Sequence, residues 1–285
     1  MAKVHELLRA GPTLSFEFWP PRDDQRFARV LDELSPLRPD FVSVTYGAAG
    51  STRERTHDLV THLQASSFLP VAHVCCAAHR RRELVGILDR YRSEGIDNVL
   101  ALRGDPPLAS DVALPPGELR YAVELVELVR AVGEFSVGVA AHPEGHPDSG
   151  GAFDADLDRA AVKLAAADYA ITQFFFRVED YLRLVDGLSA RGVDKPVVPG
   201  IMPIDRIGQV TRMAEMSGTT LPSQLTDRLE AAAHDPDEVR RIGVDVATEL
   251  AQKLHAEDVP GLHFYTMNRS ASVLAVCANL GLGAS

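Results

Sequence analysis

A single carboxylate, Glu17, interrupts the aromatic run LSFEFWPPR at residues 14–22. Burial among the three flanking aromatic residues would remove water from this carboxyl group, which raises its pKa and keeps it protonated nearer neutral pH. A protonated carboxyl group can act as a general acid. The alternative is a structural glutamate paired with a neighbouring arginine. We favour the acid, because the double proline that follows would fix the chain and hold the side chain in place.

A second carboxylate, Asp105, lies in ALRGDPP at residues 101–107, where Gly104 permits a tight turn. Aspartate before proline is common in turns and at helix caps, which gives Asp105 an ordinary structural explanation. Beside Glu17 it would instead remain ionised and stabilise a cationic intermediate or bind an amidine-like edge. The residues alone leave both interpretations open.

Two polar clusters are candidates for anion or metal binding. The run HRRREL at residues 79–84, with Arg80, Arg81 and Arg82, is either a solvated helix face or an anion site near a helix N-terminus. The segment AHPEGHP at residues 141–147 contains two histidines and a glutamate, but not in the helical spacing of a metal site. We therefore expect no bound metal.

The composition is that of an ordinary globular protein, with 285 residues, 46% hydrophobic and 24% charged, and a formal net charge of −11. The acidic balance argues against non-specific binding to nucleic acid or to an anionic membrane. No apolar run reaches the roughly 20 residues that a membrane helix requires, and the N-terminus does not resemble a signal peptide. Three cysteines give no CxxC motif and no disulfide framework. We expect a reduced, cytoplasmic protein that binds a small molecule.

Short β-branched or aromatic segments alternate with longer segments of helical periodicity, an order that predicts parallel strands joined by right-handed crossovers. Eight such units, with no GxGxxG or P-loop motif after any strand, predict an α/β protein with one (β/α)8 TIM barrel over residues 1–285. The four clearest helical segments are 24–37, 81–95, 119–133 and 156–167, and several more helices are expected within 206–261. The expected strands are residues 14–19, 41–47, 70–76, 98–104, 136–142, 169–176, 196–202 and 262–268.

Polar residues stand at the C-terminal ends of seven of the eight expected strands, where barrel enzymes collect their catalytic groups. A lone histidine such as His73 would more often be a hydrogen-bonded core residue. The convergence of polar residues from seven strand ends indicates a site at this mouth of the barrel. The residues are Glu17, Thr45, Tyr46, His73, Arg103, Gly104, Asp105, His142, Glu144, His146, Gln173, Tyr265, Asn268 and Arg269.

Seven motifs, in order along the chain, resemble those of the 5,10-methylenetetrahydrofolate reductase family. They are SFEFWPPR, FVSVTYGA with RERTH, NVLALRGDPP, AAHPEGHP, AITQFFF, PVVPGIMPI and HFYTMNR, from residue 15 to about residue 280. The resemblance implies reduction of 5,10-methylenetetrahydrofolate to 5-methyltetrahydrofolate with NAD(P)H, in one-carbon metabolism and methionine biosynthesis. It also implies a catalytic barrel alone, with no counterpart of the C-terminal regulatory domain of eukaryotic relatives.

The resemblance assigns roles position by position. Glu17 corresponds to the general acid that protonates N10 and opens the folate's five-membered ring to a 5-iminium cation, and Asp105 to the residue that binds the pterin and stabilises that cation. Further substrate-binding positions are Gln173, Tyr46, Met213, Tyr265 and Arg269. Cofactor-binding positions are Thr45, His73, Arg103, Gly104, Tyr121, Ala122, His142 and His146.

The region expected to hold the flavin's phosphates departs from the family pattern. The family has a basic helix of the type LKxKVDAGA before its ITQFFF strand, whereas this chain reads DLDRAAVKLAAADYAITQFFF, and His142 replaces the usual tyrosine. Ala161 and Val162 stand where cations are expected, and Lys163 is displaced by one residue, which rotates a helical side chain by about 100°. Each lost charge-assisted hydrogen bond would remove about 1.5–3 kcal/mol of binding free energy. We therefore predict that FAD binds poorly or not at all.

Without a flavin, the pyridine nucleotide would pass its hydride directly to the iminium, with NADH preferred and NADPH as the alternative. A second hypothesis is the same reaction through tightly bound FAD with ping-pong kinetics, if Lys163 or the arginine run compensates. A third is a catalytically silent folate-binding paralogue, against which the presence of both carboxylates argues. The sequence leaves open whether the chain forms a homo-oligomer.

Overall fold

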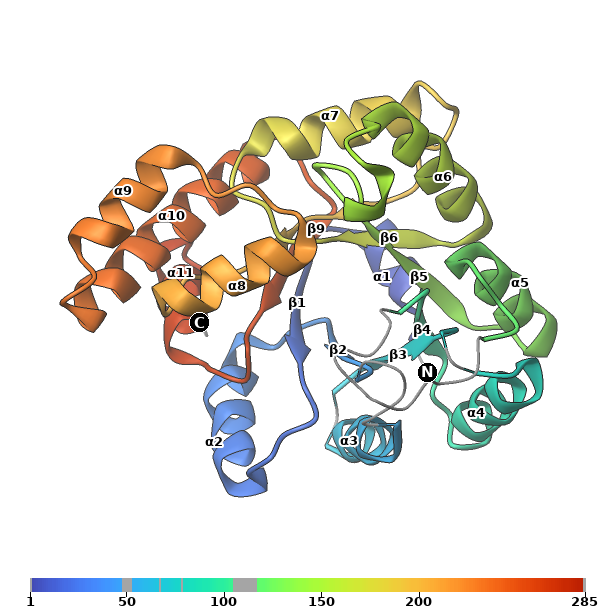
Figure 1. Ribbon diagram of the computed structural model, residues 1–285. Helices are drawn as coiled ribbons and strands as arrows, with labels where there is room; N and C mark the ends of the chain where they lie inside the picture. Colours follow the sequence, from blue (N-terminus) through green and yellow to red (C-terminus); the bar gives the residue numbers. More distant parts are fainter. Residues whose placement is uncertain (1, 48–52, 67, 78, 105–116, 284–285) are drawn as a thin grey trace, which may run out of the picture.

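The computed structural model describes residues 2–47, 53–66, 68–77, 79–104 and 117–283 (Figure 1). Within these ranges nine parallel strands form one sheet in the order β7-β6-β5-β4-β3-β2-β1-β9-β8, curled into a nearly closed barrel. The expected TIM-barrel fold is confirmed. The strands are β1 (Thr13–Phe18), β2 (Phe41–Val44), β3 (Pro70–Cys75), β4 (Asn98–Leu102), β5 (Ser136–Ala141), β6 (Tyr169–Thr172), β7 (Val197–Val198), β8 (Gly200–Ile201) and β9 (Gly261–Tyr265).

The seventh expected strand is divided in two at Pro199. Proline has no N–H to donate to the sheet, so the ladder is interrupted there. The first half, β7, pairs with β6, and the second half, β8, pairs with β9. The Pro199 carbonyl still accepts a hydrogen bond from the His263 amide at 3.0 Å. The two halves therefore bridge the two edges of the sheet, and the nine strands occupy eight barrel positions.

Helices surround the strands, and one helix closes the barrel's N-terminal end (Figure 1). The expected helix-rich segment between the last two strands is confirmed and holds three helices, the first of them beside the mouth in Figure 1. The helices are α1 (Val4–Ala10), α2 (Asp24–Leu34), α3 (Arg53–Ala65), α4 (Arg81–Ser93), α5 (Ala122–Val132), α6 (Phe153–Ala166), α7 (Val178–Ser189), α8 (Ile207–Ser217), α9 (Ser223–Ala231), α10 (Pro236–Ala256) and α11 (Ala271–Asn279), with 3₁₀ turns η1 (Ser35–Leu37) and η3 (Pro147–Ser149).

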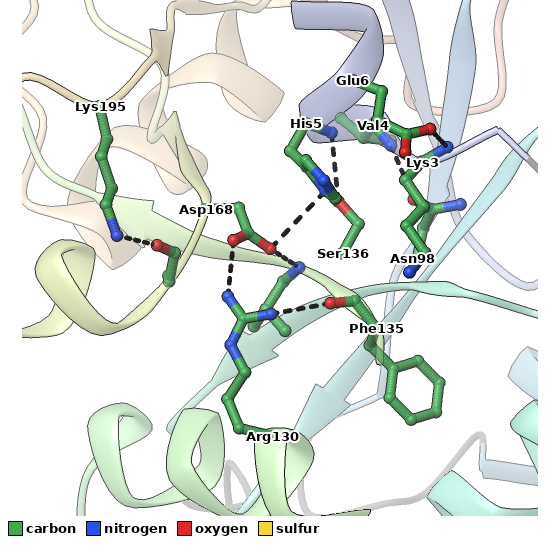
Figure 2. Close-up of polar contacts among 12 residues, drawn as sticks. Lys3, Val4, His5, Glu6, Asn98, Arg130, Phe135, Ser136, Asp168 and Lys195 are labelled. Atoms are coloured by element: carbon green, nitrogen blue, oxygen red, sulfur yellow. Dashed lines mark hydrogen bonds and ion pairs between the residues drawn. The ribbon is translucent and has the colours of Figure 1, made fainter. Parts of the chain in front are cut away.

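The helix α1 is fixed beneath the barrel by side chains at the starts of β4 and β5 (Figure 2). The Val4 amide donates to Asn98 Oδ1 at 2.8 Å, and the His5 amide donates to Ser136 Oγ at 3.2 Å. Val4 and Leu8 pack into the barrel interior against a buried apolar cluster. The N-terminal residues therefore form a plug that separates the lower core from solvent.

The main core lies between the sheet and the surrounding helices, and a smaller cluster lies inside the barrel. Along β1, Phe16 and Phe18 belong to the outer core, and the Phe18 ring meets Phe27 of α2 edge-on at 5.3 Å. Across the described ranges, every helix is too short or too polar to cross a membrane.

Most strands end earlier than the sequence pattern predicts. In the structure β2 ends at Val44 and β6 ends at Thr172, whereas their predicted ends are residues 47 and 176. After β6 the aromatic residues Phe174 and Phe175 are buried in apolar clusters, so composition alone extends the predicted strand. Their backbones nevertheless leave the sheet, and the polar candidates Thr45, Tyr46 and Gln173 lie in the loops that follow β2 and β6.

Candidate active site

Glu17 lies near the C-terminal end of β1, in register with Ser43 of β2 and Tyr265 of β9. Alternate residues of a strand point to opposite faces, so the outward packing of Phe16 and Phe18 turns Glu17 inward. The residue is only 9% exposed. The predicted placement of this carboxyl group inside the barrel is confirmed.

Burial raises the pKa of Glu17 to about 8, against a smaller opposing effect from a hydrogen bond with the Trp19 side chain. His73 of β3 is a titratable neighbour, with its Nε2 3.6 Å from Glu17 Oε2. Burial lowers the pKa of His73 to about 3, so the imidazole is neutral at pH 7. Glu17 and His73 therefore form an uncharged contact rather than an ion pair, and no arginine in the described ranges lies within ion-pair distance of Glu17.

Tyr265 extends across the mouth from β9 to β6. Its hydroxyl donates to the Thr172 carbonyl at 2.6 Å, and burial, with a contribution from Glu17, raises its pKa well above 10. Gly200 makes this position possible, because a Cβ there would lie 2.4 Å from the Thr172 carbonyl oxygen and 2.6 Å from the Tyr265 ring. The Tyr265 side chain therefore lies beside Glu17 with its hydroxyl uncharged.

The ends of β1 and β9 are joined by hydrogen bonds just above Glu17. Asn268 Oδ1 accepts from the Trp19 amide at 2.9 Å, and Asn268 Nδ2 donates to the Trp19 carbonyl at 2.8 Å. Thr266 Oγ1 donates to the Glu17 carbonyl at 2.7 Å. The sequence reasoning singled out Asn268 without a role and missed Thr266, whose only signal was its place between Tyr265 and Asn268.

A basic cluster lies at the ends of β4 and β5. Arg103 Nη2 contacts Asp148 Oδ2 at 2.7 Å, and the rings of His142 and His146 meet edge-on with centroids 4.7 Å apart. Burial, followed by the nearby charge of Lys163, lowers the pKa of His142 to about 3. These predicted cofactor residues are therefore brought together.

Lys163 of α6 belongs to the same cluster despite its one-residue displacement. Burial lowers its pKa to about 8, with Asp156 opposing and Arg103 reinforcing that shift. Ala161 instead packs into the outer core, and Val162 is 62% exposed to solvent. The face of α6 that meets the cluster thus carries Lys163 rather than the two positions where the family pattern expects cations.

The donor set fits a diphosphate-bearing cofactor. Arg103 and Lys163 supply two cations. The planar guanidinium group of arginine and the ammonium group of lysine are the usual partners of phosphate oxygens. The His146 amide donates to Asp156 Oδ2 at 2.9 Å, which ties the loop after β5 to α6 and fixes the geometry of the cluster. Lys163 therefore supplies a cation to the cluster, although Ala161 and Val162 replace the cations that the family pattern expects for FAD.

Four other predicted cofactor positions lie after β2, after β4 and at the start of α5. Gly104 adopts a φ of 82°, and a Cβ there would come within 2.9 Å of Cys75 Cβ, so both its backbone conformation and its packing favour glycine. Tyr121 is 56% exposed at the N-terminus of α5, where Ala122 is the first helical residue. The Thr45 amide donates to the Phe18 carbonyl at 3.0 Å, beside Glu17's strand.

The predicted substrate residues divide into those near the mouth and one that lies apart. Gln173 and His142 line the same small pocket, with a volume of about 10 Å³. Met213 and Tyr265 pack against one apolar cluster, and Arg269 Nη1 lies 3.7 Å from Asp205 Oδ2. Tyr46 instead lines a hollow beside α3 and α4, and its hydroxyl contacts His79 Nε2 at 2.9 Å.

Two further predicted features are Asp105 and the arginine run at residues 80–82. Asp105 lies outside the described residues, so its position relative to Glu17 stays a prediction. Arg80, Arg81 and Arg82 are exposed at the start of α4, consistent with the solvated helix face.

Comparison with known proteins identifies the family. The family model "Methylenetetrahydrofolate reductase" matches residues 3–281. The chain is 39% identical over 280 residues to the 5,10-methylenetetrahydrofolate reductase of Pectobacterium carotovorum, covering 96% of this chain and 92% of that one. The chain belongs to the methylenetetrahydrofolate reductase family. The Escherichia coli K12 reductase is 38% identical over 277 residues, covering 94% of this chain and 90% of that one.

A longer member of the methylenetetrahydrofolate reductase family and one solved structure are also similar to this chain. The Arabidopsis thaliana protein "Methylenetetrahydrofolate reductase (NADH) 1" is 33% identical over 297 residues, which cover 98% of this chain and 50% of that longer one. A solved Clostridium thermocellum protein, described as binding two copies of 5-methyl-5,6,7,8-tetrahydrofolic acid, has a TM-score of 0.71 at 13% identity. It covers 98% of this chain and 97% of its own, and at that identity it supports the fold alone.

Proposed function

We propose that this chain reduces 5,10-methylenetetrahydrofolate to 5-methyltetrahydrofolate, with NAD(P)H as the source of the hydride. Membership in the reductase family supports an oxidoreductase acting on this folate. The observation that carries the proposal is the buried Glu17 carboxyl group, which its surroundings keep protonated near neutral pH. A folate ring can be opened only if its departing nitrogen receives a proton.

Glu17 donates that proton to N10 of the folate, which releases the nitrogen and leaves a 5-iminium cation as the hydride acceptor. The neutral neighbours His73 and Tyr265 do not compete, because neither holds a dissociable proton with a pKa near 7. Gln173, Tyr265, Met213 and Arg269 would hold the folate, and Asp105 would stabilise the cation. A positioned general acid contributes about 10²–10⁴-fold to a rate.

The route of the hydride has two versions. The sequence pattern favours direct transfer from the nicotinamide, because Ala161 and Val162 replace expected cations. The position of Lys163 beside Arg103 and His142 favours the flavin route, because it restores a cation to the same cluster. Arg103, Lys163, His142 and His146 would hold the phosphates of FAD, with Thr45, His73, Gly104, Tyr121 and Ala122 along its length. Bound there, FAD would accept the hydride from NAD(P)H and deliver it to the folate.

The absorbance spectrum of the purified protein distinguishes the two routes. A yellow protein that loses activity when stripped of flavin, and regains it with FAD, would establish the flavin route. A colourless protein that oxidises NAD(P)H only in the presence of 5,10-methylenetetrahydrofolate, with sequential kinetics, would establish direct transfer. Assays with NADH and NADPH in parallel determine the nucleotide preference.

A silent folate-binding paralogue is the competing class of function. It predicts folate binding in calorimetry but no folate-dependent oxidation of NAD(P)H, with or without added FAD. That result would overturn the reductase proposal.

A further inference from the structure

A carboxylate of the chain itself lies on the basic cluster at the mouth. Asp148 Oδ2 contacts Arg103 Nη2 at 2.7 Å and lies 3.8 Å from His146 Nδ1. Arg103, first through a hydrogen bond and then through its charge, lowers the pKa of Asp148, so this carboxyl group is ionised at neutral pH. An anion of the protein therefore occupies part of the guanidinium group that is predicted to hold a cofactor phosphate.

Carboxylate and phosphate oxygens bind a guanidinium group in the same way, through N–H groups arranged in a planar fork. A phosphate that approaches Arg103 competes with Asp148 for these donors. The two anions would also repel each other if both stayed on the guanidinium group. Binding of a phosphate to Arg103 therefore favours departure of the Asp148 carboxylate.

The other carboxylate of the cluster, Asp156, is held in a different way. Its side chain is 15% exposed, and its Oδ2 accepts from the His146 amide at 2.9 Å. The Asp148 side chain is 62% exposed, so water can solvate this carboxylate once it leaves Arg103. Asp156 is thus part of the framework of the cluster, whereas Asp148 is a removable partner of Arg103.

The 3₁₀ turn η3, which carries Asp148, is fixed at its start and loosely packed after its end. Pro147 lies against Gly218, where a Cβ would come within 2.8 Å of the proline ring. Gly150 and Gly151 follow the turn with φ angles of 57° and 84°. A Cβ at either glycine would meet no atom within 4 Å in the described part of the chain. The end of the turn therefore has room to move without disturbing the core.

We propose that Asp148 is an internal counter-ion, which covers Arg103 in the ligand-free protein and moves away when a phosphate-bearing cofactor binds. This inference rests on the proposed function, in that it takes Arg103 as a cofactor residue. An exposed ion pair is weak, so the closed turn is only about 1.4- to fivefold more populated than the open one. The cofactor therefore binds about two- to sixfold more weakly than it would to a turn that is always open.

Asp148→Asn tests the competition, because asparagine keeps the size of the side chain and removes its charge. The parent and the variant, freed of any flavin that copurifies, are titrated with FAD and with NADH. We expect the dissociation constant of the ligand that occupies the cluster to fall about two- to sixfold in Asp148→Asn. If Asp148 instead orients Arg103 for the phosphate, binding weakens. Unchanged or weaker binding of both ligands would overturn the proposal.

Asp154→Asn is the matched control for the loss of a negative charge. Asp154 lies in the first turn of α6, where its side chain is 92% exposed and 3.8 Å from Arg191. This variant should bind FAD and NADH as the parent does. An equal gain of affinity in Asp154→Asn and Asp148→Asn would mean that the effect is one of overall charge, and the proposal would fail.

Arg103→Gln completes a double-mutant cycle with Asp148→Asn. In the Arg103→Gln background the second substitution should change affinity by less than about twofold, because no guanidinium group remains to compete for. A full two- to sixfold gain in that background would contradict the competition, and so would failure of both the parent and Asp148→Asn to bind either ligand. A parent that binds the cofactor without folate-dependent oxidation of NAD(P)H would contradict the proposed function instead.

Discussion

The chemistry of Glu17 depends on how little charge surrounds it. A carboxyl group beside a cation would ionise well below neutral pH and could not donate a proton at pH 7. Here the neighbouring His73 is itself neutral because it is buried. The aromatic composition of LSFEFW predicted this burial correctly, because alternate aromatic residues of β1 pack outward. The neutral histidine could not be predicted, since it depends on how β3 aligns with β1 through β2.

The raised pKa of Glu17 has a consequence for stability. In the unfolded chain Glu17 ionises near pH 4.5, and in the folded chain near pH 8, so its contribution is greatest below pH 4.5 and is lost as pH rises to about 8. Glu17→Gln has no such charge. Its unfolding free energy, relative to that of the parent, should therefore increase by about 2–4 kcal/mol between pH 5 and pH 8.5.

Urea unfolding of both proteins at these two pH values measures the difference. Other groups that titrate in this range, Lys163 among them, are common to both chains and cancel. A difference that does not change with pH would mean that Glu17 is already ionised in the folded protein at pH 5.

Sequence patterns predicted some features of the elements around the mouth and not others. Eight barrel positions were predictable from the alternation of strands and helices. The division of the seventh strand at Pro199 was not identified, although a proline inside a strand is a signal for it. The side of α6 on which Lys163 lies was also not predictable. A one-residue displacement in sequence can be offset by where the helix begins and how it is rotated.

Gly200 in β8 tests the packing that positions Tyr265. The added methyl group of Gly200→Ala would meet the Thr172 carbonyl and the Tyr265 ring, and overpacking of this kind costs about 1–3 kcal/mol. We expect a lower Tm together with a reduced kcat, because the wall beside Glu17 must shift. Gly86→Ala is the matched control, since its Cβ would meet nothing within 4 Å in the middle of α4.

The control variant should be more stable than the parent by about 0.5–1 kcal/mol, as alanine is the better helix former. Thermal unfolding and steady-state kinetics of both variants provide the comparison. Equal Tm and activity for Gly200→Ala and Gly86→Ala would show that the Tyr265 contact has no energetic importance.

Lys163 of α6 tests the basic cluster. Lys163→Ala removes a cation beside Arg103 and His142, and we expect at least a tenfold weaker affinity for the phosphate-bearing cofactor, whether FAD or the pyridine nucleotide. Val162→Ala, one residue earlier on the exposed face, should bind as the parent does. Titration of each variant with FAD and with NADH gives the dissociation constants. Identical constants for the two variants would remove Lys163 from the cofactor site.

At the scale of the whole molecule, the two ends of the barrel have separate tasks. The C-terminal mouth carries the acid and the basic cluster, whereas the N-terminal end is closed by α1 and a polar network. In this network Asp168 accepts from the Val137 amide at 2.8 Å and from Arg130 Nη2 at 2.7 Å, and it lies 3.9 Å from His5 Nδ1 (Figure 2). The sequence analysis did not identify α1 as an element, because seven residues give too short a periodic pattern.

Asp168→Ala tests this division. It leaves the Val137 amide and the Arg130 guanidinium without their shared acceptor, and we expect a loss of about 1–3 kcal/mol in unfolding free energy. The kcat should stay within about twofold of the parent's, because Asp168 lies at the end of the barrel away from Glu17. Thermal unfolding and a folate-dependent assay give the two quantities. A large fall in kcat with an unchanged Tm would contradict the separation.

The central claim is that Glu17 supplies the proton for reduction of 5,10-methylenetetrahydrofolate. The most direct measurement is NAD(P)H oxidation by the parent chain and by Glu17→Gln, with 5-methyltetrahydrofolate identified by mass spectrometry. We predict folate-dependent turnover by the parent and a loss of about 10²–10⁴-fold in Glu17→Gln, with folate binding retained. Undiminished formation of 5-methyltetrahydrofolate by Glu17→Gln would contradict the account.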